Sequence, residues 1–369
     1  MSEPLPQAYS ARVLCGWNEA NSIQAEWNEL FQQASFPQVF YSHAWIGTVC
    51  DTLIDSRKLR VLTLWGGEPG ETLMALVPFF EVAALGGKGL WPASAHSGDL
   101  FDPLLRQENP ALLSAFWTAL EGLQASYQFV WFPLLSSRFC QAPLGPPEGM
   151  KWGAPVCRAR TPNLYLERPE GLDFDTFLKE SMRRKSRQNL GRQIRKLEER
   201  GEVLWEILRE PETVGRFIPE IESIERESWK GRDGLGLFSN KQVGAFYRRV
   251  LPRLADEGIL EITCLRVGGF SVAYEMTFFR DHTRLVHNQA FLPDYASHSP
   301  GLLLLVRNLE RVFAEGVARV DFLQGDLEFK RRFTNQRQDL FDMAFFAPTF
   351  WGKVNAAVFH WLTRKRKKR

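Results

Sequence analysis

The sequence contains few cysteines, and their placement excludes two kinds of stabilised domain. Its 369 residues include five cysteines, which are far apart in the chain and form no CxxC pair. Disulfide scaffolds and zinc modules need paired or closely spaced cysteines. We therefore expect neither a disulfide framework nor a metal site, and a reducing cytoplasm suits this composition.

Long apolar runs and a strong net charge are missing as well. Residues 1–14 lack the basic and apolar regions of a signal peptide. The most apolar late stretch, residues 340–362, is interrupted by Asp342, Lys353 and His360, so it does not supply the roughly 20 apolar residues of a membrane-spanning helix. A net charge of +3 creates no general attraction for polyanions. The sequence predicts a cytoplasmic protein.

Several common catalytic motifs are absent too. There is no P-loop, no dinucleotide-binding G-x-G-x-x-G, no HExxH and no G-x-S-x-G, and the GGKG of residues 86–89 lacks the rest of a Walker motif. Hydrophobic residues make up 44% and charged residues 24% of the chain, as in globular proteins. The chain is long enough for two domains, each with its own core.

Hydrophobic periodicity predicts the same order of elements in both halves of the chain. The order is a strand, two helices, antiparallel strands, a helix and a strand, and Gly268-Gly269 marks the clearest hairpin. In the first half the elements are residues 11–17, 18–34, 42–53, 58–67, 72–82, 110–123 and 127–134, with an irregular stretch at 89–105. In the second half they are residues 202–208, 212–229, 243–258, 259–267, 270–280, 283–292, 301–316, 318–323, 326–333 and 340–347.

Four stretches of the second half resemble a known family. They are SRQNLGRQIRKLEERG (186–201), AFLPDYASHSPGLLLL (290–305), FAEGVARVDFLQGD (313–326) and EFKRRF (328–333). Together with the order of elements, they resemble the Gcn5-related N-acyltransferase (GNAT) superfamily. Within it they resemble the tandem-lobed CelD or BioF2-like acetyltransferases, which are related to the FemABX peptidoglycan aminoacyltransferases.

The resemblance implies an α+β (mixed α/β) fold with two tandem GNAT-like lobes, each a mostly antiparallel sheet flanked by helices. We expect a non-catalytic lobe at residues 1–165, a catalytic lobe at 166–348 and an amphipathic, polybasic segment at 349–369. The first lobe has FVWFPLLSSRF where the second has VDFLQGDLEFKRRF. It therefore lacks the acidic pair and the lysine of the second lobe.

The segment YASHSPG predicts a helix start that binds an anion. Pro300 suits the first turn of a helix and Gly301 leaves the backbone accessible, while exposed amides at a helix N-terminus attract phosphate. The resemblance implies that Ser299, Pro300, Gly301 and Leu302 bind acyl-CoA, the acyl donor, through its pyrophosphate. The alternative is a Ser-Pro helix cap without a ligand.

The stretch DFLQGDLEFKRRF, residues 321–333, carries the main catalytic prediction. Asp321 ends a strand, Gly325 allows a turn, and Asp326 can cap a short helix on which it shares one face with Lys330. An ammonium group beside carboxylates can stabilise the oxyanion that forms when an amine attacks a thioester. The resemblance implies that Lys330 lies at the reaction centre, and the alternative is a surface ion pair.

The general base has several candidates. His287 lies in a middle strand, and its neutral imidazole can accept a proton near neutral pH. Glu275 lies one strand earlier, and the carboxylates of Asp321 and Asp326 are further options. A lone polar residue in an apolar strand is more often a hydrogen-bonded wall residue, so the choice stays open.

The basic helix predicted over residues 179–200 contains nine lysines and arginines. It is either a solvated surface or a clamp for an anionic acceptor, such as a nucleotide-sugar, a lipid-linked diphosphate or an anionic polysaccharide. Arg187 and Arg192 match positions that recur in the family, and Tyr295 and Phe329 are further predicted substrate contacts. Nucleic acid is expected as a partner only if a charged tRNA is the donor.

Residues 350–369 combine aromatic and apolar residues at helical spacing with six consecutive basic residues, RKRKKR. Such a segment suits the surface of an anionic membrane. The alternative is a helix that docks on the protein itself.

Together these features predict transfer of an acyl group from acyl-CoA to an amine or hydroxyl of a sugar or lipid-linked precursor of a cell-surface polysaccharide. The acceptor class comes from the resemblance. Two alternatives stay open. One is transfer from aminoacyl-tRNA, as in the FemABX relatives, and the other is a non-catalytic, membrane-associated scaffold of a polysaccharide assembly system.

Overall fold

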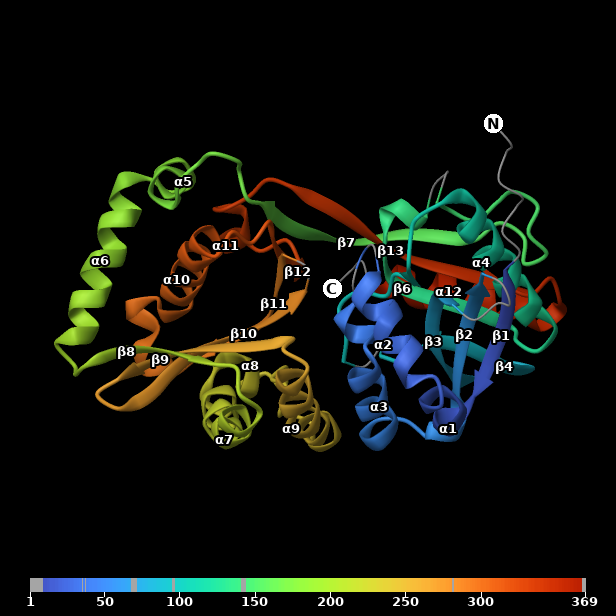
Figure 1. Ribbon diagram of the computed structural model, residues 1–369, viewed down its shortest axis with the longest axis horizontal. Helices are drawn as coiled ribbons and strands as arrows, with labels where there is room; N and C mark the ends of the chain where they lie inside the picture. The colour runs from blue at the N-terminus through green and yellow to red at the C-terminus, as the bar shows by residue number, and fades with distance from the viewer. Residues whose placement is uncertain are drawn as a thin grey trace. The chain divides into compact units, whose positions relative to one another are not determined.

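The computed structural model describes residues 9–34, 36, 38–67, 72–94, 97–140, 144–280 and 282–366, the side chains of 363–366 excepted. The chain divides into two compact units (Figure 1). Unit 1 consists of Met1–Thr161 and Asp339–Arg369, and unit 2 consists of Pro162–Gln338. Residues 339–348, which the sequence predicts in the second lobe, therefore belong with the first half of the chain.

Unit 1 contains a sheet with the strand order β1-β2-β3-β4-β6-β13. Its neighbouring strands are antiparallel except for β4 and β6, which are parallel, and β5 pairs with β3. The strands are β1 (Ser10–Cys15), β2 (Leu59–Gly66), β3 (Thr72–Ala84), β4 (Gly87–Pro92), β5 (Leu104–Leu105), β6 (Phe129–Ser136) and β13 (Arg337–Phe346). The helices are α1 (Gly16–Asn21), α2 (Gln24–Gln33), α3 (His43–Thr52), α4 (Pro110–Gly122) and α12 (Phe350–Arg366).

Two parts of unit 1 differ from the sequence prediction. Residues 18–34, predicted as one helix, form α1 and α2 because the chain turns between them. Residues 89–105, predicted as irregular, begin inside β4, which pairs with β3. The turn into β4 is made by Gly86 and Gly87, whose φ angles of 72° and 154° favour glycine.

The strand β13 joins unit 1 through its apolar residues. Its residues from Leu340 to Phe346 pair antiparallel with β6, and Met343 and Phe345 are fully buried. The ring of Phe345 lies 5.9 Å from that of Trp117 on α4. Hydrophobic periodicity identifies such a strand but does not say which sheet it joins, which is why the sequence prediction assigned it to the other lobe.

Unit 2 contains a sheet with the strand order β7-β12-β11-β10-β9-β8. In it β11 and β12 are parallel and the other neighbours are antiparallel. The strands are β7 (Val156–Glu167, with its first residues in unit 1), β8 (Val203–Leu208), β9 (Leu260–Val267), β10 (Phe270–Arg280), β11 (Thr283–Phe291) and β12 (Arg319–Gln324). The helices are α5 (Phe174–Ser181), α6 (Arg184–Glu198), α7 (Pro211–Glu227), α8 (Trp229–Arg232), α9 (Lys241–Asp256), α10 (Pro300–Ala314) and α11 (Glu328–Arg331).

Helices cover both faces of the unit 2 sheet. Helices α7 and α9 lie on one face and α10 on the other (Figure 1). The core beneath α10 includes Leu304 and Leu309 of that helix and Leu265 of β9. The predicted fold class, a mixed α/β fold with a mostly antiparallel sheet flanked by helices, is confirmed.

The parallel strands β11 and β12 separate towards their C-terminal ends. They pair over only three residues each, beginning at Thr283 and Arg319. Beyond these pairs, β11 continues to Phe291 and β12 to Gln324. Functional groups of α/β folds gather where parallel strands part at their carboxyl ends, and α10 begins shortly after this end of β11.

The basic segment 179–200 forms two helices, α5 and α6, rather than one. The Arg187 guanidinium donates hydrogen bonds to the backbone carbonyls of Lys179, at 3.1 Å, and Met182. These carbonyls lie at the end of α5, where the helix leaves its last acceptors without internal partners. Arg187 therefore stabilises the corner between the two helices.

A buried charge cluster links β9, β11 and α10. Glu261 is 0% exposed and accepts hydrogen bonds from Arg284 at 2.7 Å and from Arg311 at 2.7 and 2.9 Å. Arg209 adds a fourth at 2.8 Å. Because Arg284 is itself only 1% exposed, its charge depends on this carboxylate.

We expect Glu261→Gln to lower the free energy of unfolding by about 3–5 kcal/mol, because it leaves a buried arginine without its carboxylate. Glu315→Gln removes a partly exposed partner of Arg311 and is the matched control, with an expected loss below about 1 kcal/mol. Chemical denaturation followed by circular dichroism measures both. Equal stabilities for the two variants would contradict this account of the cluster.

Candidate functional site

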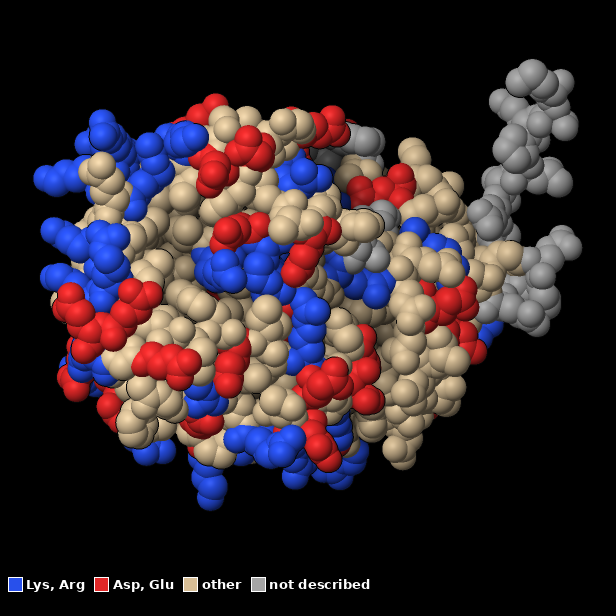
Figure 2. Space-filling model, turned by 60° about the vertical axis from the view of Figure 1, so that its left-hand side comes forward, with Lys and Arg blue, Asp and Glu red and all other residues tan. Residues whose placement is uncertain are grey.

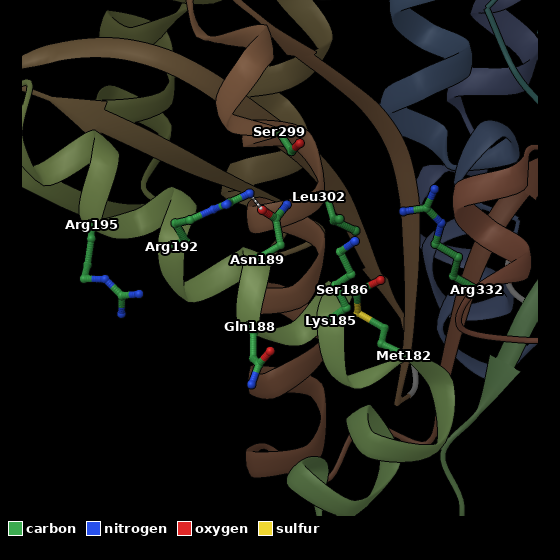
Figure 3. A pocket seen from close by; sticks show the side chains of 10 residues that line it. All are labelled: Met182, Lys185, Ser186, Gln188, Asn189, Arg192, Arg195, Ser299, Leu302 and Arg332. Carbon is green, nitrogen blue, oxygen red and sulfur yellow. Dashed lines mark hydrogen bonds between the residues drawn. The ribbon is translucent and has the colours of Figure 1, made fainter.

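A pocket of about 550 Å³ lies in unit 2, beside α6 and the start of α10. It is lined by Met182, Lys185, Ser186, Gln188, Asn189, Arg192, Arg195, Ser299, Leu302 and Arg332 (Figure 3). Four of these side chains are cationic and none is acidic. The pocket therefore suits a ligand that carries several negative charges.

The N-terminus of α10 adds a second attraction for anions, because the amides and the dipole of a helix start favour negative charge. Ser299 precedes the helix in a left-handed conformation with φ 53°. Its carbonyl accepts from the amides of Leu302 and Leu303, but its hydroxyl makes no capping hydrogen bond within the described structure. Ser299 is among the residues that line the pocket.

Few carboxylates lie close enough to neutralise the positive charges of the pocket. Across the described residues, Lys185, Arg192 and Arg195 form no ion pair, and Arg192 donates to a neutral amide at 2.6 Å. Arg332 pairs at 3.1 Å with Glu328, whose side chain is 88% exposed. On the face seen in Figure 2, lysine and arginine side chains gather in groups between acidic ones. The small net charge of the chain thus conceals local basic regions.

The four predicted donor-binding residues occupy different positions around this pocket. Ser299 and Leu302 line it, whereas Pro300 and Gly301 are buried. A Cβ atom on Gly301 would lie 2.7 Å from Oε1 of Gln289. This glycine therefore makes room for a side chain of β11, and its binding of the donor stays a prediction.

Of the four predicted substrate contacts, the structure places one in the pocket. Arg192 lines it, whereas Arg187 is bound to the end of α5. The guanidinium of Arg200 lies over the ring of Tyr295, 4.0 Å from its centroid. Phe329 packs against the apolar core of unit 2.

Lys330 and Asp326 do not form the pair that their spacing predicts. Lys330 is 6% exposed, and its ammonium donates to the carbonyls of Leu323 at 3.2 Å and Gln324 at 2.7 Å. Asp326 pairs with Arg331, and this hydrogen bond lowers the pKa of the Asp326 carboxyl group. Because α11 begins two residues after Asp326, this carboxylate lies outside the helix and does not cap it.

Asp321 holds the irregular end of β12. It is 1% exposed and accepts from the amide of Leu323 at 2.8 Å, from Asn163 at 3.0 Å and from Arg319 at 3.2 Å. The pairing with β7 shifts register after Asp321, and Leu323 has a φ of 55°. Asp321 therefore stabilises the segment of backbone whose carbonyls, those of Leu323 and Gln324, accept hydrogen bonds from Lys330.

The two predicted bases in the middle of the sheet lie in different surroundings. His287 is partly exposed, and its Nε2 lies 2.9 Å from the hydroxyl of Tyr247. Glu275 is 0% exposed and accepts from Asn308 at 2.7 Å and from Gln289 at 2.9 Å. Protein donors thus enclose Glu275, whereas the Nδ1 atom of His287 is buried and its Nε2 atom contacts Tyr247.

Sequence reasoning missed three of the four cations in the pocket. Lys185 and Arg195 lie on α6 with Arg192, at spacings of seven and three residues that place side chains on one helical face. This spacing is a signal that the sequence contains. Arg332 follows α11 and reaches the pocket from a distant part of the chain, so no local pattern identifies it.

A buried polar cluster on α7, β10 and β11 was also missed. Glu225 is 1% exposed and accepts from the hydroxyl of Tyr274 and the amide of Asn288, both at 2.7 Å. Lys230 donates to Asn288 and to the carbonyl of Gln289. These residues are too far apart in the sequence for a motif to reveal them.

Residues 184–331 match the family model of the acetyltransferase (GNAT) domain. The matched range runs from the start of α6 to the end of α11 and contains most of the pocket. Over these residues unit 2 is similar to the GNAT acetyltransferase domain. The resemblance to the GNAT superfamily seen in the sequence is thereby confirmed, and most residues of the basic pocket lie in the matched range. No curated protein sequence matches the chain.

Solved structures share the fold over most of the chain, beyond the GNAT domain alone. FemX has a TM-score of 0.57 at 11% identity, covering 86% of this chain and 95% of its own. The C-terminal domain of an Agrobacterium fabrum protein named as a lysylphosphatidylglycerol synthetase has a TM-score of 0.56 at 14% identity, with coverage of 92% and 95%. For L-PGS from Bacillus licheniformis the values are 0.54, 14%, 90% and 95%. At identities this low, the structural similarity establishes a common fold and no more.

Inside the GNAT domain, Glu275 makes stability depend on pH. Burial raises the pKa of its carboxyl group to about 7 from an ordinary value of 4.5, against the opposing hydrogen bonds from Asn308 and Gln289. The folded protein thus binds this proton more tightly than the unfolded chain does. The resulting stabilisation is fully present below pH 4.5 and is lost as pH rises through about 7.

We therefore expect the unfolding free energy to fall between pH 4.5 and pH 8 by on the order of 3 kcal/mol through this group. Glu275→Gln cannot ionise, so its stability is expected to lack this component. Chemical denaturation of the wild-type protein and of this variant across the pH range gives the contribution of Glu275 as the difference between their free energies of unfolding. Parallel stability curves would show that Glu275 does not titrate in this range.

Proposed function

We propose that the protein is an acyltransferase that moves an acyl group from acyl-CoA to an amine or hydroxyl group. The basic pocket at the start of α10 carries this proposal, because it joins four cationic side chains to a helix N-terminus inside a GNAT domain. Coenzyme A bears a diphosphate and a further phosphate. Arginine side chains and helix amides are the groups that bind phosphate best in proteins.

The separation of β11 and β12 supports a position for the thioester of the acyl donor between the two strands. Beyond their three paired residues, the facing edges of these strands are not hydrogen-bonded to each other. Backbone donors at such an edge can bind a carbonyl oxygen as it becomes an oxyanion. In the proposed reaction the acceptor nitrogen or oxygen attacks the thioester carbon, the carbon–sulfur bond breaks, and the acceptor proton passes through a base to the departing thiolate.

We infer that His287 is this base. Glu275 and Asp321 are 0% and 1% exposed, and protein donors occupy their oxygens. Asp326 is bound to Arg331. His287 lies on β11, which borders the opening, and its Nε2 hydrogen-bonds to the hydroxyl of Tyr247 while its Nδ1 is buried. A neutral imidazole is the group best suited to accept a proton near neutral pH.

Lys330 is the proposed stabiliser of the oxyanion. Its ammonium is held at the end of β12, on the opposite side of the opening from β11, by two carbonyls. Asp321 keeps that end of the strand in place. A preorganised charge of this kind favours a transition state in which negative charge develops.

The proposed acceptor is a sugar or lipid-linked precursor of a cell-surface polysaccharide, modified on the cytoplasmic side of the membrane. This class follows from the resemblance to CelD or BioF2-like acetyltransferases. The uncompensated cations of the pocket are compatible with an anionic acceptor as well as with an anionic donor.

The resemblance of the sequence to the FemABX aminoacyltransferases favours a second candidate, transfer of an aminoacyl group from tRNA, and the fold is shared with FemX. In that case Lys185, Arg192 and Arg195 bind tRNA phosphates. Binding then weakens steeply as the salt concentration rises, because phosphate contacts release counterions.

Calorimetric titration with acetyl-CoA and longer acyl-CoAs tests the leading proposal. We expect the wild-type protein to bind, and replacing both Arg192 and Arg195 with alanine to weaken binding by at least about tenfold, since each loses a charge-assisted contact to phosphate. Lys196→Ala removes one positive charge from α6 outside the pocket. This control is expected to leave the affinity within about twofold.

Three outcomes decide between the candidates. Binding of acyl-CoA that the double variant loses supports the acyltransferase. Binding of tRNA with strong salt dependence, and no binding of acyl-CoA, favours the aminoacyl transferase. No binding of either ligand overturns both and leaves a scaffold without transferase activity.

A further inference from the structure

Helix α12 of unit 1 exposes an unusual amount of apolar surface. Within its seventeen residues, five large hydrophobic side chains are exposed by 40–72%: Phe350, Trp351, Val358, Trp361 and Leu362. They account for five of the thirteen large hydrophobic residues described as exposed in the chain. Apolar side chains exposed singly are ordinary, but such a concentration marks an interaction surface.

These five side chains share one face of the helix. At about 100° per residue, they fall within an arc of roughly 120°. The residues that attach α12 to unit 1, including Asn355 and Phe359, lie beyond one edge of that arc and are buried. The apolar face is therefore separate from the docked face, so the structure has both a docked helix and an exposed stripe.

The loop between β3 and β4 extends this surface. Asn355 donates to the carbonyl of Leu85 at 2.9 Å and accepts from its amide at 3.2 Å. Leu85 is 47% exposed, and the ring of Trp351 covers Gly86 so closely that a Cβ there would lie 2.1 Å from it. Leu85 and the five residues of α12 form what we call the apolar patch.

The sequence around the patch has a charge of one sign. Residues 348–369 contain no aspartate or glutamate. The basic run RKRKKR occupies residues 364–369, whose side chains lie outside the described part of the structure. The alternation of aromatic and apolar residues with nearby basic ones is what anionic bilayer surfaces select, because rings insert at the headgroup level while lysine and arginine meet lipid phosphates.

We propose that the apolar patch binds the surface of an anionic lipid bilayer. The aromatic and aliphatic side chains enter the interface, and the basic run contributes electrostatic attraction. Among the described residues no helix has the length and apolar content needed to cross a membrane, so α12 lies on the bilayer. The bilayer is the occupant that the charge favours, because the basic residues beside the patch are of one sign and each basic residue near an anionic bilayer adds about 1 kcal/mol of attraction.

Co-sedimentation with lipid vesicles tests this proposal on the full chain. We expect binding to vesicles of equal parts phosphatidylcholine and phosphatidylglycerol, and much weaker binding to phosphatidylcholine alone. High salt is expected to reduce binding, since it screens the basic run. A blue shift of tryptophan fluorescence on vesicle addition is expected to accompany binding.

Two variants distinguish binding through the apolar patch from non-specific binding through any exposed hydrophobic side chain. The double variant Trp361→Ser and Leu362→Ser is expected to weaken vesicle binding by at least about tenfold. Phe270→Ser removes a side chain that is 75% exposed in unit 2 and is expected to leave binding unchanged. Circular dichroism checks that both variants are folded.

The proposal is overturned if wild-type protein does not bind anionic vesicles, or if the two variants bind equally well. It is also overturned if size-exclusion chromatography shows a dimer that the double variant abolishes while vesicle binding is absent, because the patch is then an interface between copies of the chain. None of these results depends on acyl-CoA binding, so they are independent of the proposed transferase activity.

Discussion

The start of α10 is fixed to the sheet by one side-chain amide, that of Gln289 on β11. Its nitrogen lies 2.9 Å from the buried carboxylate of Glu275 and 2.7 Å from the carbonyl of Gly301. Gly301 has no Cβ, and the amide occupies the space that a Cβ would need. Because of this contact, the helix N-terminus is held next to the basic residues of α6, and the pocket keeps its shape.

Buried polar groups on both faces of the unit 2 sheet reinforce this arrangement. Glu261 and its arginines lie towards α10, and Glu225 with its tyrosine and asparagine lies towards α7. A buried carboxylate is costly unless its donors are in place, so each cluster accepts only one register of the elements around it. These clusters give the GNAT domain a rigid frame in which β11 and β12 can part.

Much of unit 2 is predictable from its sequence, and the reasons are local. The Gly268-Gly269 turn and the apolar periods of α7, α9 and α10 each determine one element. The predictions that differ from the structure concern contacts that the local sequence pattern does not determine. The pairing of β13 with β6 is decided by packing. Lys330 donates to two backbone carbonyls, and the carboxylate four residues before it pairs with Arg331. Helical spacing on α6 would have predicted two more pocket cations, whereas Arg332 reaches the pocket only through the fold.

The central claim is that a polyanionic acyl donor binds between α6 and the first turn of α10. Hydrogen–deuterium exchange of the whole chain, with and without acetyl-CoA, tests it most directly. The account predicts slower exchange in the amides from Ser299 to Leu305 and in α6, with unit 1 unchanged. Protection confined to unit 1, or no protection anywhere, would contradict it.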